Sequence, residues 1–387
     1  FFLKDKAVLH YIGLENAAIN LSRTDPAWNY RFLQDYFDPP GPRDPKKAGI
    51  AFNLKEVRLV NVAFQQKDAW IGQNMTGRVG SLWLDANNIG FTEREIDINR
   101  LELERPYFSM YNYTGNRPPV EKAVSPNDAA KAWNAQNWTA IIRNLIIEDG
   151  TFKSDRKGLT PTVAHFDPQH ILFQEINGTI KDFKLAVDTL RANIDLTTKE
   201  RSGLEVQTFT AAFRMHPQLL EFGNLRLKTG KSVLTDYLAM QYKSMADLND
   251  FIHAVTLDAR FKNSSLSSDD IAYFTPQVAS WERNVQISGA VKGTIDALSG
   301  ESVALQMGRN TSFFGDFNLV GLPDINTTFI HVRANDLKTS YSDAVTFIPA
   351  LKKTTMPNLA ALGNIRFNGS DTGFINDVVT FCTLQTS

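Results

Sequence analysis

The stretch Leu145-Ile146-Ile147-Glu148-Asp149-Gly150-Thr151-Phe152 contains the pattern that decides the fold. Apolar residues stand at its first, third and eighth positions, and a small residue stands at the sixth. The same pattern begins at Ile12, Val57 and Leu101, so the four copies start 45, 44 and 44 residues apart, and a weaker fifth copy begins at Ala259. A fixed period of this length indicates stacked supersecondary units.

Within each copy, apolar residues alternate with polar ones, as Leu101 and Leu103 alternate with Glu102 and Glu104. This period of two is typical of a half-buried strand. The fifth position holds Asn, Arg or Asp before the small residue, which predicts a bulge or tight turn that returns the next apolar residue to the same face. The sequence therefore predicts a mainly β, repeat-built fold of antiparallel strands with short interspersed helices.

Length and composition narrow the possible classes of protein. We expect one continuous body over residues 1–387, most regular over 1–152 and less regular over 153–387. A net charge of −1 argues against a nucleic-acid partner, which requires a basic face. The single cysteine, Cys382, excludes an intrachain disulfide. The chain begins at Phe1 without an initiator methionine, so we expect a piece of a longer protein.

Motifs of catalysis and cofactor binding are missing from the sequence, so we expect no enzymatic activity, no catalytic residues and no cofactor. The strongest candidate for a metal site is the segment from His165 to His170, which contains two imidazoles and Asp167. A turn before a strand is the favoured interpretation of that segment, and we predict no metal. The acidic pairs at residues 93–95 and 102–104 alternate with other residues, which favours a solvated strand face over a glycosidase site.

Short motifs between the repeats resemble the large TamB/AsmA-like proteins of the Bacteroidota, in order and spacing, over nearly the whole chain. They are Asp68-Ala69-Trp70-Ile71-Gly72, Gly80-Ser81-Leu82, Asn116-Arg117-Pro118-Pro119, Lys199-Glu200-Arg201-Ser202-Gly203-Leu204, Asp270-Ile271-Ala272-Tyr273-Phe274 and Gly321-Leu322-Pro323-Asp324-Ile325.

The resemblance implies a curled antiparallel sheet that forms an elongated U-shaped groove, or β-taco, with an apolar interior. It also implies a periplasmic protein that is anchored in the inner membrane by an upstream segment. Its implied partners are phospholipid or other acyl lipids and, through a region absent from this chain, a BamA/TamA-like barrel of the outer membrane. The implied function is transfer of phospholipid between the membranes during outer-membrane biogenesis.

The apolar positions of the four copies are the predicted groove lining. A groove lined in this way would shield acyl chains, at about 0.8 kcal/mol per buried methylene. Three alternatives remain, namely the closed core of an ordinary β-helix or sandwich, a scaffold that assists outer-membrane protein assembly by β-augmentation, and a carbohydrate-active solenoid. The lining residues are Ile12, Leu14, Ile19, Val57, Leu59, Phe64, Leu101, Leu103, Phe108, Leu145, Ile147 and Phe152.

Overall fold

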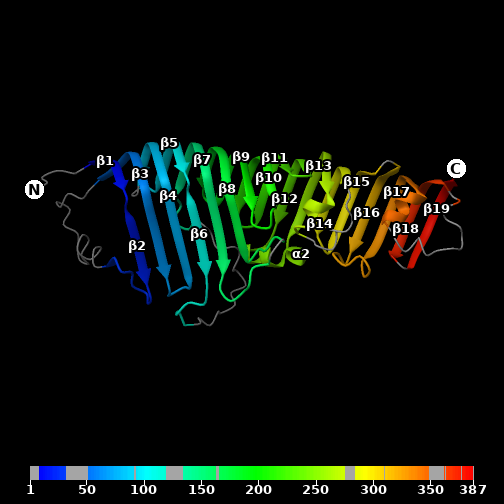
Figure 1. Ribbon diagram of the computed structural model, residues 1–387, viewed down its shortest axis with the longest axis horizontal. Helices are drawn as coiled ribbons and strands as arrows, with labels where there is room; N and C mark the ends of the chain where they lie inside the picture. The colour runs from blue at the N-terminus through cyan, green and yellow to red at the C-terminus, as the bar shows by residue number, and fades with distance from the viewer. Residues whose placement is uncertain are drawn as a thin grey trace, which may run out of the picture. The chain divides into compact units, whose positions relative to one another are not determined.

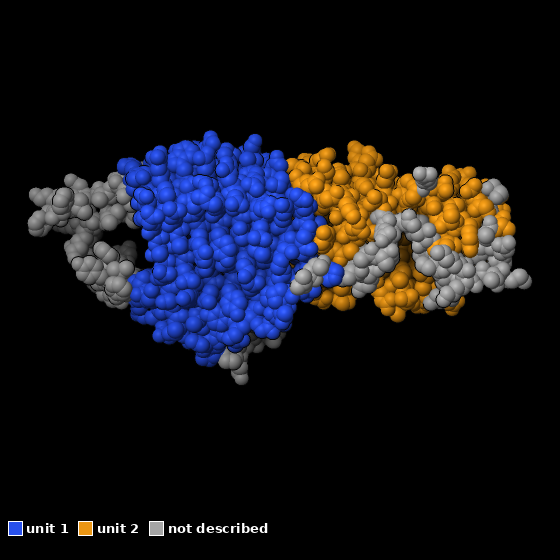
Figure 2. All heavy atoms as spheres, in the orientation of Figure 1, with its two compact units in different colours: residues 1–206 blue, residues 207–387 orange. Residues whose placement is uncertain are grey.

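Most of the described chain is β-strand. The computed structural model describes residues 8–31, 51–90, 93–118, 134–162, 165–274, 284–308, 310–347, 361, 363–375 and 377–386. The predicted mainly β fold with few short helices is confirmed. Contacts within the chain define two compact units, residues 1–206 and residues 207–387, which are coloured separately in Figure 2. The expectation of one continuous body stays a prediction.

The first unit holds one sheet, whose strands lie side by side in Figure 1. β1 and β2 both pair with β3, and β5 and β6 both lie between β4 and β7, so each of these pairs is one strand interrupted once. The strands are β1 (Val8–Glu15), β2 (Ala18–Arg23), β3 (Ala51–Asp68), β4 (Gln73–Gly90), β5 (Glu95–Glu104), β6 (Tyr107–Asn112), β7 (Thr139–Arg156), β8 (His170–Ala186) and β9 (Thr189–Glu200).

The second unit is an antiparallel sheet in which β11 to β19 pair with their neighbours along the chain. Its strands are β10 (Glu205–His216), β11 (Leu219–Thr229), β12 (Val233–Gln241), β13 (Thr256–Ser267), β14 (Asn284–Thr294), β15 (Ala297–Met307), β16 (Thr311–Val320), β17 (Phe329–Ser340), β18 (Asn364–Phe374) and β19 (Asp377–Thr386). The helices are η1 (Met245–Asp250), α2 (Phe251–Ala254), α3 (Ser268–Ile271) and α4 (Tyr341–Phe347). Among the described residues, no helix has the length and apolar character needed to cross a bilayer.

The period of about 44 residues has a direct cause in the strand pairing of the first unit. β1 runs parallel to β3, which places Ile12 opposite Val57, and β5 runs parallel to β7, which places Leu101 opposite Leu145. Equivalent positions of two successive copies therefore lie side by side. The other pairs, such as β3 with β4 and β7 with β8, are antiparallel as predicted. The two parallel pairs require crossover connections, because a short hairpin joins only antiparallel strands.

The fifth position of every repeat copy adopts a left-handed backbone conformation. This conformation interrupts the regular extended strand, and a residue that adopts it is commonly part of a bulge that bends the strand. All five copies therefore contain this conformation at the predicted position, and the strand pairing shifts register beside Asp149 and Asn263. The residues and their φ angles are Asn16 (52°), Asn61 (52°), Arg105 (48°), Asp149 (53°) and Asn263 (51°).

The bend has an outer and an inner side. Each left-handed residue is exposed, whereas the residue that follows it is buried in several strands. Asn61 precedes the buried Val62, Asp149 precedes the buried Gly150, and Ser302, whose φ is 48°, precedes the fully buried Val303. Side chains crowd together on the inside of a bend, so the face that carries these buried residues is the inner face.

Gly150 shows how tight the inner side is. A Cβ atom at this position would lie 3.0 Å from Ile147 Cγ2 and 3.2 Å from Ile176 Cβ. The glycine in the sixth position of this copy is therefore explained by space, since Ile147 and the neighbouring strand already occupy the inside of the bend.

The ends of β2 and β3 are joined by a buried ion pair. Arg23 Nε donates to Asp68 Oδ1 at 2.8 Å and Arg23 Nη2 donates to Oδ2 at 2.6 Å, while the backbone N–H of Ile71 donates to Oδ1 at 3.1 Å. Asp68 is 1% exposed. The hydrogen bond from Arg23 is the main reason why the pKa of Asp68 lies below its ordinary value of 3.8.

We expect this pair to make stability depend on pH. Because the folded-state pKa of Asp68 is lowered, its stabilisation is present above the ordinary pKa and is lost as the pH falls through the lowered value. Asp68→Asn should lose this part of the acid dependence and should reduce the free energy of unfolding by about 2 kcal/mol at neutral pH. Urea titrations at several pH values would measure the free energy of unfolding and its dependence on pH. Glu56→Gln, which breaks the exposed pair with Arg58, should leave stability nearly unchanged.

Candidate functional site

The inner face of the first unit carries three apolar rows that run across the strands. Each row follows residues that are directly opposite one another in neighbouring strands, from β1 or β2 to β8 or β9. The first row is Ile12, Val57, Leu84, Leu101, Leu145, Ile180 and Ile194. The second row is Leu14, Leu59, Leu82, Leu103, Ile147, Gly178 and Leu196. The third row is Ile19, Phe64, Gly77, Phe108, Phe152 and Phe173.

All twelve predicted lining residues lie in these rows, four in each. None of them is buried. Leu14 is 37% exposed, Ile19 and Phe108 are each 41% exposed, and the other nine are half-buried. The structure therefore gathers the predicted residues on one face and leaves that face accessible. Their contact with lipid stays a prediction.

The third row is largely aromatic. The rings of Phe108 and Phe152 stack with their centroids 6.1 Å apart and their planes at 18°. Gly77 stands between Phe64 and Phe108 in this row, and the nearest neighbour of a Cβ built there is Phe64 Cβ at 4.0 Å. The missing side chain leaves space beside two phenyl rings, which widens the apolar surface at this point.

The first row is the best covered of the three. Ile12, Val57 and Leu101 pack against a cluster of buried apolar residues from the ends of β3, β4 and β5. Of the second row, Leu82 also packs against that cluster, whereas Leu59, Leu103 and Ile147 do not. The accessible apolar surface is therefore concentrated in the second and third rows. The cluster consists of Leu54, Leu84, Ala86, Ile89 and Ile98.

The sequence pattern missed the members of the rows that lie on β4, β8 and β9. β4 and β8 run antiparallel to the strands that carry the repeat, so their apolar residues appear in reverse order along the chain. β9 runs in the same direction as β7, but it carries only Ile194 and Leu196 of the pattern and has Arg201 in place of the last apolar residue. Leu82 and Leu84 do alternate with polar neighbours, and this alternation was the available signal. A search for one pattern in one direction cannot place them in the rows.

The opposite face of the first unit is charged. Arg58 contacts Glu56 at 2.6 Å and Arg100 contacts Glu102 at 2.5 Å, and both pairs lie on strands that carry the rows. The hydrogen bond from Arg58 is the main reason why the pKa of Glu56 is lowered. Ion pairs on one face and accessible apolar residues on the other make the sheet amphipathic, with the apolar side on the inside of the bend.

The inner face of the second unit carries a comparable row, which begins at the buried Ser264 beside the left-handed Asn263. Its members are opposite one another in the pairing of β13 to β19. The inner face of this unit therefore also carries apolar residues. After Ser264 the row consists of Ile287, Leu305, Phe313, Leu337, Phe367 and Leu384.

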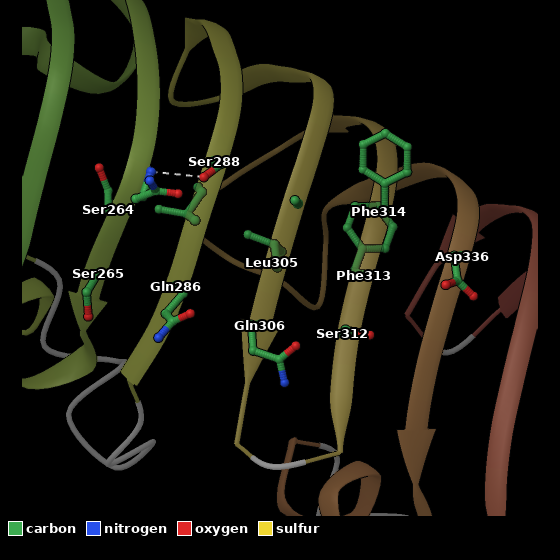
Figure 3. A pocket seen from close by; sticks show the side chains of 13 residues that line it. Ser264, Ser265, Gln286, Ser288, Leu305, Gln306, Ser312, Phe313, Phe314 and Asp336 are labelled. Atoms are coloured by element: carbon green, nitrogen blue, oxygen red, sulfur yellow. Dashed lines mark hydrogen bonds between the residues drawn. The ribbon is translucent and has the colours of Figure 1, made fainter.

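A cavity of about 510 Å³ lies over β13 to β17 of the second unit (Figure 3). Gln286, Gln306 and Ser312 line it from three neighbouring strands, in positions that alternate with the apolar row. Ser288 Oγ accepts a hydrogen bond from the backbone N–H of Asn263 at 3.0 Å. Amides and hydroxyls line this cavity together with the apolar residues Ile287, Leu305 and Phe313 of the row. Among the described residues that line it, no nucleophile is paired with a base.

The segment from His165 to His170 forms the turn that the sequence favours. Asp167 Oδ1 accepts from the backbone N–H of Gln169 at 2.9 Å, and Oδ2 accepts from that of Thr162 at 3.0 Å. Within the ranges that the structure describes, no group of three His, Cys, Asp or Glu side chains is arranged to hold a metal ion. Asp167 thus serves the turn through its carboxylate oxygens.

Comparison of the chain with protein-family models, with curated proteins and with solved structures found no match.

Proposed function

We propose that this protein shields the acyl chains of lipid on the inner face of its bent sheets and transfers phospholipid between membranes. The observation that carries the proposal is the set of three continuous apolar rows in which none of the twelve predicted residues is buried. In a closed sandwich, a second layer would bury residues of this kind. The location in the periplasm, the membrane anchor and an outer-membrane barrel partner belong to the proposal through the resemblance to TamB/AsmA-like proteins.

The energetics favour sliding over tight binding. An acyl chain of roughly 16 carbons that leaves a bilayer must regain on the order of 12 kcal/mol, at about 0.8 kcal/mol per methylene. Rows that repeat at each strand supply similar apolar contacts at successive positions. A lipid tail can therefore move from strand to strand without leaving one specific site, and the protein requires no reaction chemistry for this step.

We expect lipid to accompany the purified protein. Native mass spectrometry of protein prepared without detergent should show mass increments that match phospholipid, and lipid extraction should identify them. A phospholipid with a photoreactive acyl chain should crosslink to the second and third rows, at residues such as Leu59 or Phe152. Crosslinks confined to the charged face, at residues such as Arg58, would contradict the proposal.

The alternative function is a scaffold that assists the assembly of outer-membrane proteins by β-augmentation. It rests on β19, where every residue described is exposed, including Phe381 at 73% and Val379 at 57%. An exposed strand of this kind can pair with an incoming strand. Proline at an outward-facing N–H of β19 should then impair function, whereas charges in the apolar rows should not.

A further inference from the structure

A second cavity, of about 310 Å³, lies in the first unit where β6 and β7 end and β8 begins. Its lining is strongly basic, since four of the residues around it are cations and one is a carboxylate. It lies on the face opposite to the apolar rows, because Lys153 and Asp155 alternate with Phe152 along β7. The cations are Lys153, Arg156, Lys157 and Arg201, and the carboxylate is Asp155.

His170 lines the same cavity and is 4% exposed. Its Nδ1 lies 3.1 Å from Asp155 Oδ1, so a carboxylate holds one side of the imidazole ring. Its Nε2 is buried, and the described part of the chain offers it no hydrogen-bond partner. A buried polar atom without a partner is costly, and a bound ligand is one way in which proteins satisfy it.

The cations of the cavity are only partly neutralised by the protein. Lys153 Nζ lies 2.7 Å from Asp155 Oδ2, and this hydrogen bond is the main reason why the pKa of Lys153 is raised. Arg201 Nη2 lies 3.8 Å from Asp167 Oδ2 and donates to the carbonyl oxygen of Thr162. Arg156 Nη1 donates to Gln169 Oε1 at 3.4 Å. Two carboxylates thus face four cations, and the surplus of positive charge favours an anion.

We propose that this cavity binds a phosphate group. Arg and Lys side chains provide charge-assisted hydrogen bonds to phosphate oxygens. With Asp155 accepting from Nδ1–H, Nε2 of His170 accepts from a P–O–H group, or donates to a phosphate oxygen once the ring is protonated. Leu159, Pro161 and Leu172 also line the cavity and suit the carbon atoms of a phosphate ester. A lipid headgroup and a soluble phosphate ester share this chemistry, and only the lipid source rests on the function proposed above.

The test follows the ring nitrogens of His170 by ¹⁵N NMR, with inorganic phosphate as the first probe and chloride to hold ionic strength constant. The signal of Nε2 should shift saturably. Arg156→Gln with Lys157→Gln removes two exposed cations and should weaken phosphate binding at least about tenfold, as expected for the loss of charge-assisted bonds. Lys181→Gln with Lys184→Gln removes two exposed cations from β8 outside this cavity and should leave the binding unchanged.

Vesicles distinguish the two sources. The phosphate belongs to a lipid headgroup if phosphatidylglycerol vesicles bind the wild-type protein but not the variant with Arg156→Gln and Lys157→Gln. Galactolipid vesicles given the same charge with oleate should then bind neither protein. A response to inorganic phosphate without vesicle binding assigns a soluble ester. The site is disproved if neither probe shifts Nε2 saturably, or if the variant responds as the wild type does. If the protein binds phosphate but takes up no acyl chain, the phosphate site is supported and the function proposed above is refuted.

Discussion

Replacing Leu59, Leu103 and Ile147 together by aspartate is expected to abolish the capture of acyl lipid. The three residues belong to the second row, in which Leu59 and Leu103 both lie opposite Leu82 and Leu103 lies opposite Ile147. Three carboxylates would then interrupt the row on strands β3, β5 and β7. A carboxylate beside a hydrocarbon chain loses its hydration without gaining a partner, which costs several kcal/mol. Lipid that copurifies or crosslinks with the wild type should therefore be absent from the variant.

The matched control places charges on the other face of the same strands. Val60→Asp and Ile146→Asp alter the neighbours of Leu59 and Ile147, and β5 already carries Glu102 on that face. This control should retain lipid. Serine at the three row positions provides an uncharged variant if aspartate prevents folding, and circular dichroism would report the fold. Unchanged lipid capture in the folded aspartate variant would refute a role for the apolar rows.

The second large effect concerns the bend itself. Gly178 has a φ angle of 139° and stands in the second row between Ile147 and Leu196. A Cβ atom there would lie 2.0 Å from the backbone oxygen of Asp195. Gly178→Ala combines backbone strain with a steric clash, so we expect a loss of about 4 kcal/mol in the free energy of unfolding. Urea denaturation followed by circular dichroism would measure it.

Gly158 is the matched control for Gly178. Its φ angle of 87° is also positive, but a Cβ atom at Gly158 would meet no atom within 4 Å. Gly158→Ala should therefore cost only the backbone strain, about 1 kcal/mol. Equal losses in the two variants would show that backbone conformation alone, rather than crowding of the strands, decides the cost at Gly178.

Much of the fold follows from the local pattern of the repeat. Alternation predicts the strands, and a polar residue before a small one predicts the interruption that the structure shows at Asn61 and Asp149. Both signals are local, because strand period and backbone handedness depend on neighbouring residues. The same alternation places the twelve apolar residues on one face, since the left-handed residue shifts the parity by one position.

Pairing partners could not be derived from the repeat. The pattern does not tell whether copies beginning at Ile12 and Val57 are adjacent and parallel, because that depends on the path of the connection between them. The basic cavity around His170 was also missed. Lys153, His170 and Arg201 come from three separate segments, and only the pairing of β7 with β8 and the turn after β9 bring them together.

Because the left-handed residue lies within each repeat copy, curvature is encoded locally along the chain. β1 is parallel to β3, and β3 is antiparallel to β4. The same order recurs in the next three strands, where β5 is parallel to β7 and β7 is antiparallel to β8. Gene duplication or deletion of such a three-strand block would join matching edges and preserve the register of the strands on either side. The apolar rows would thus lengthen or shorten by whole three-strand blocks.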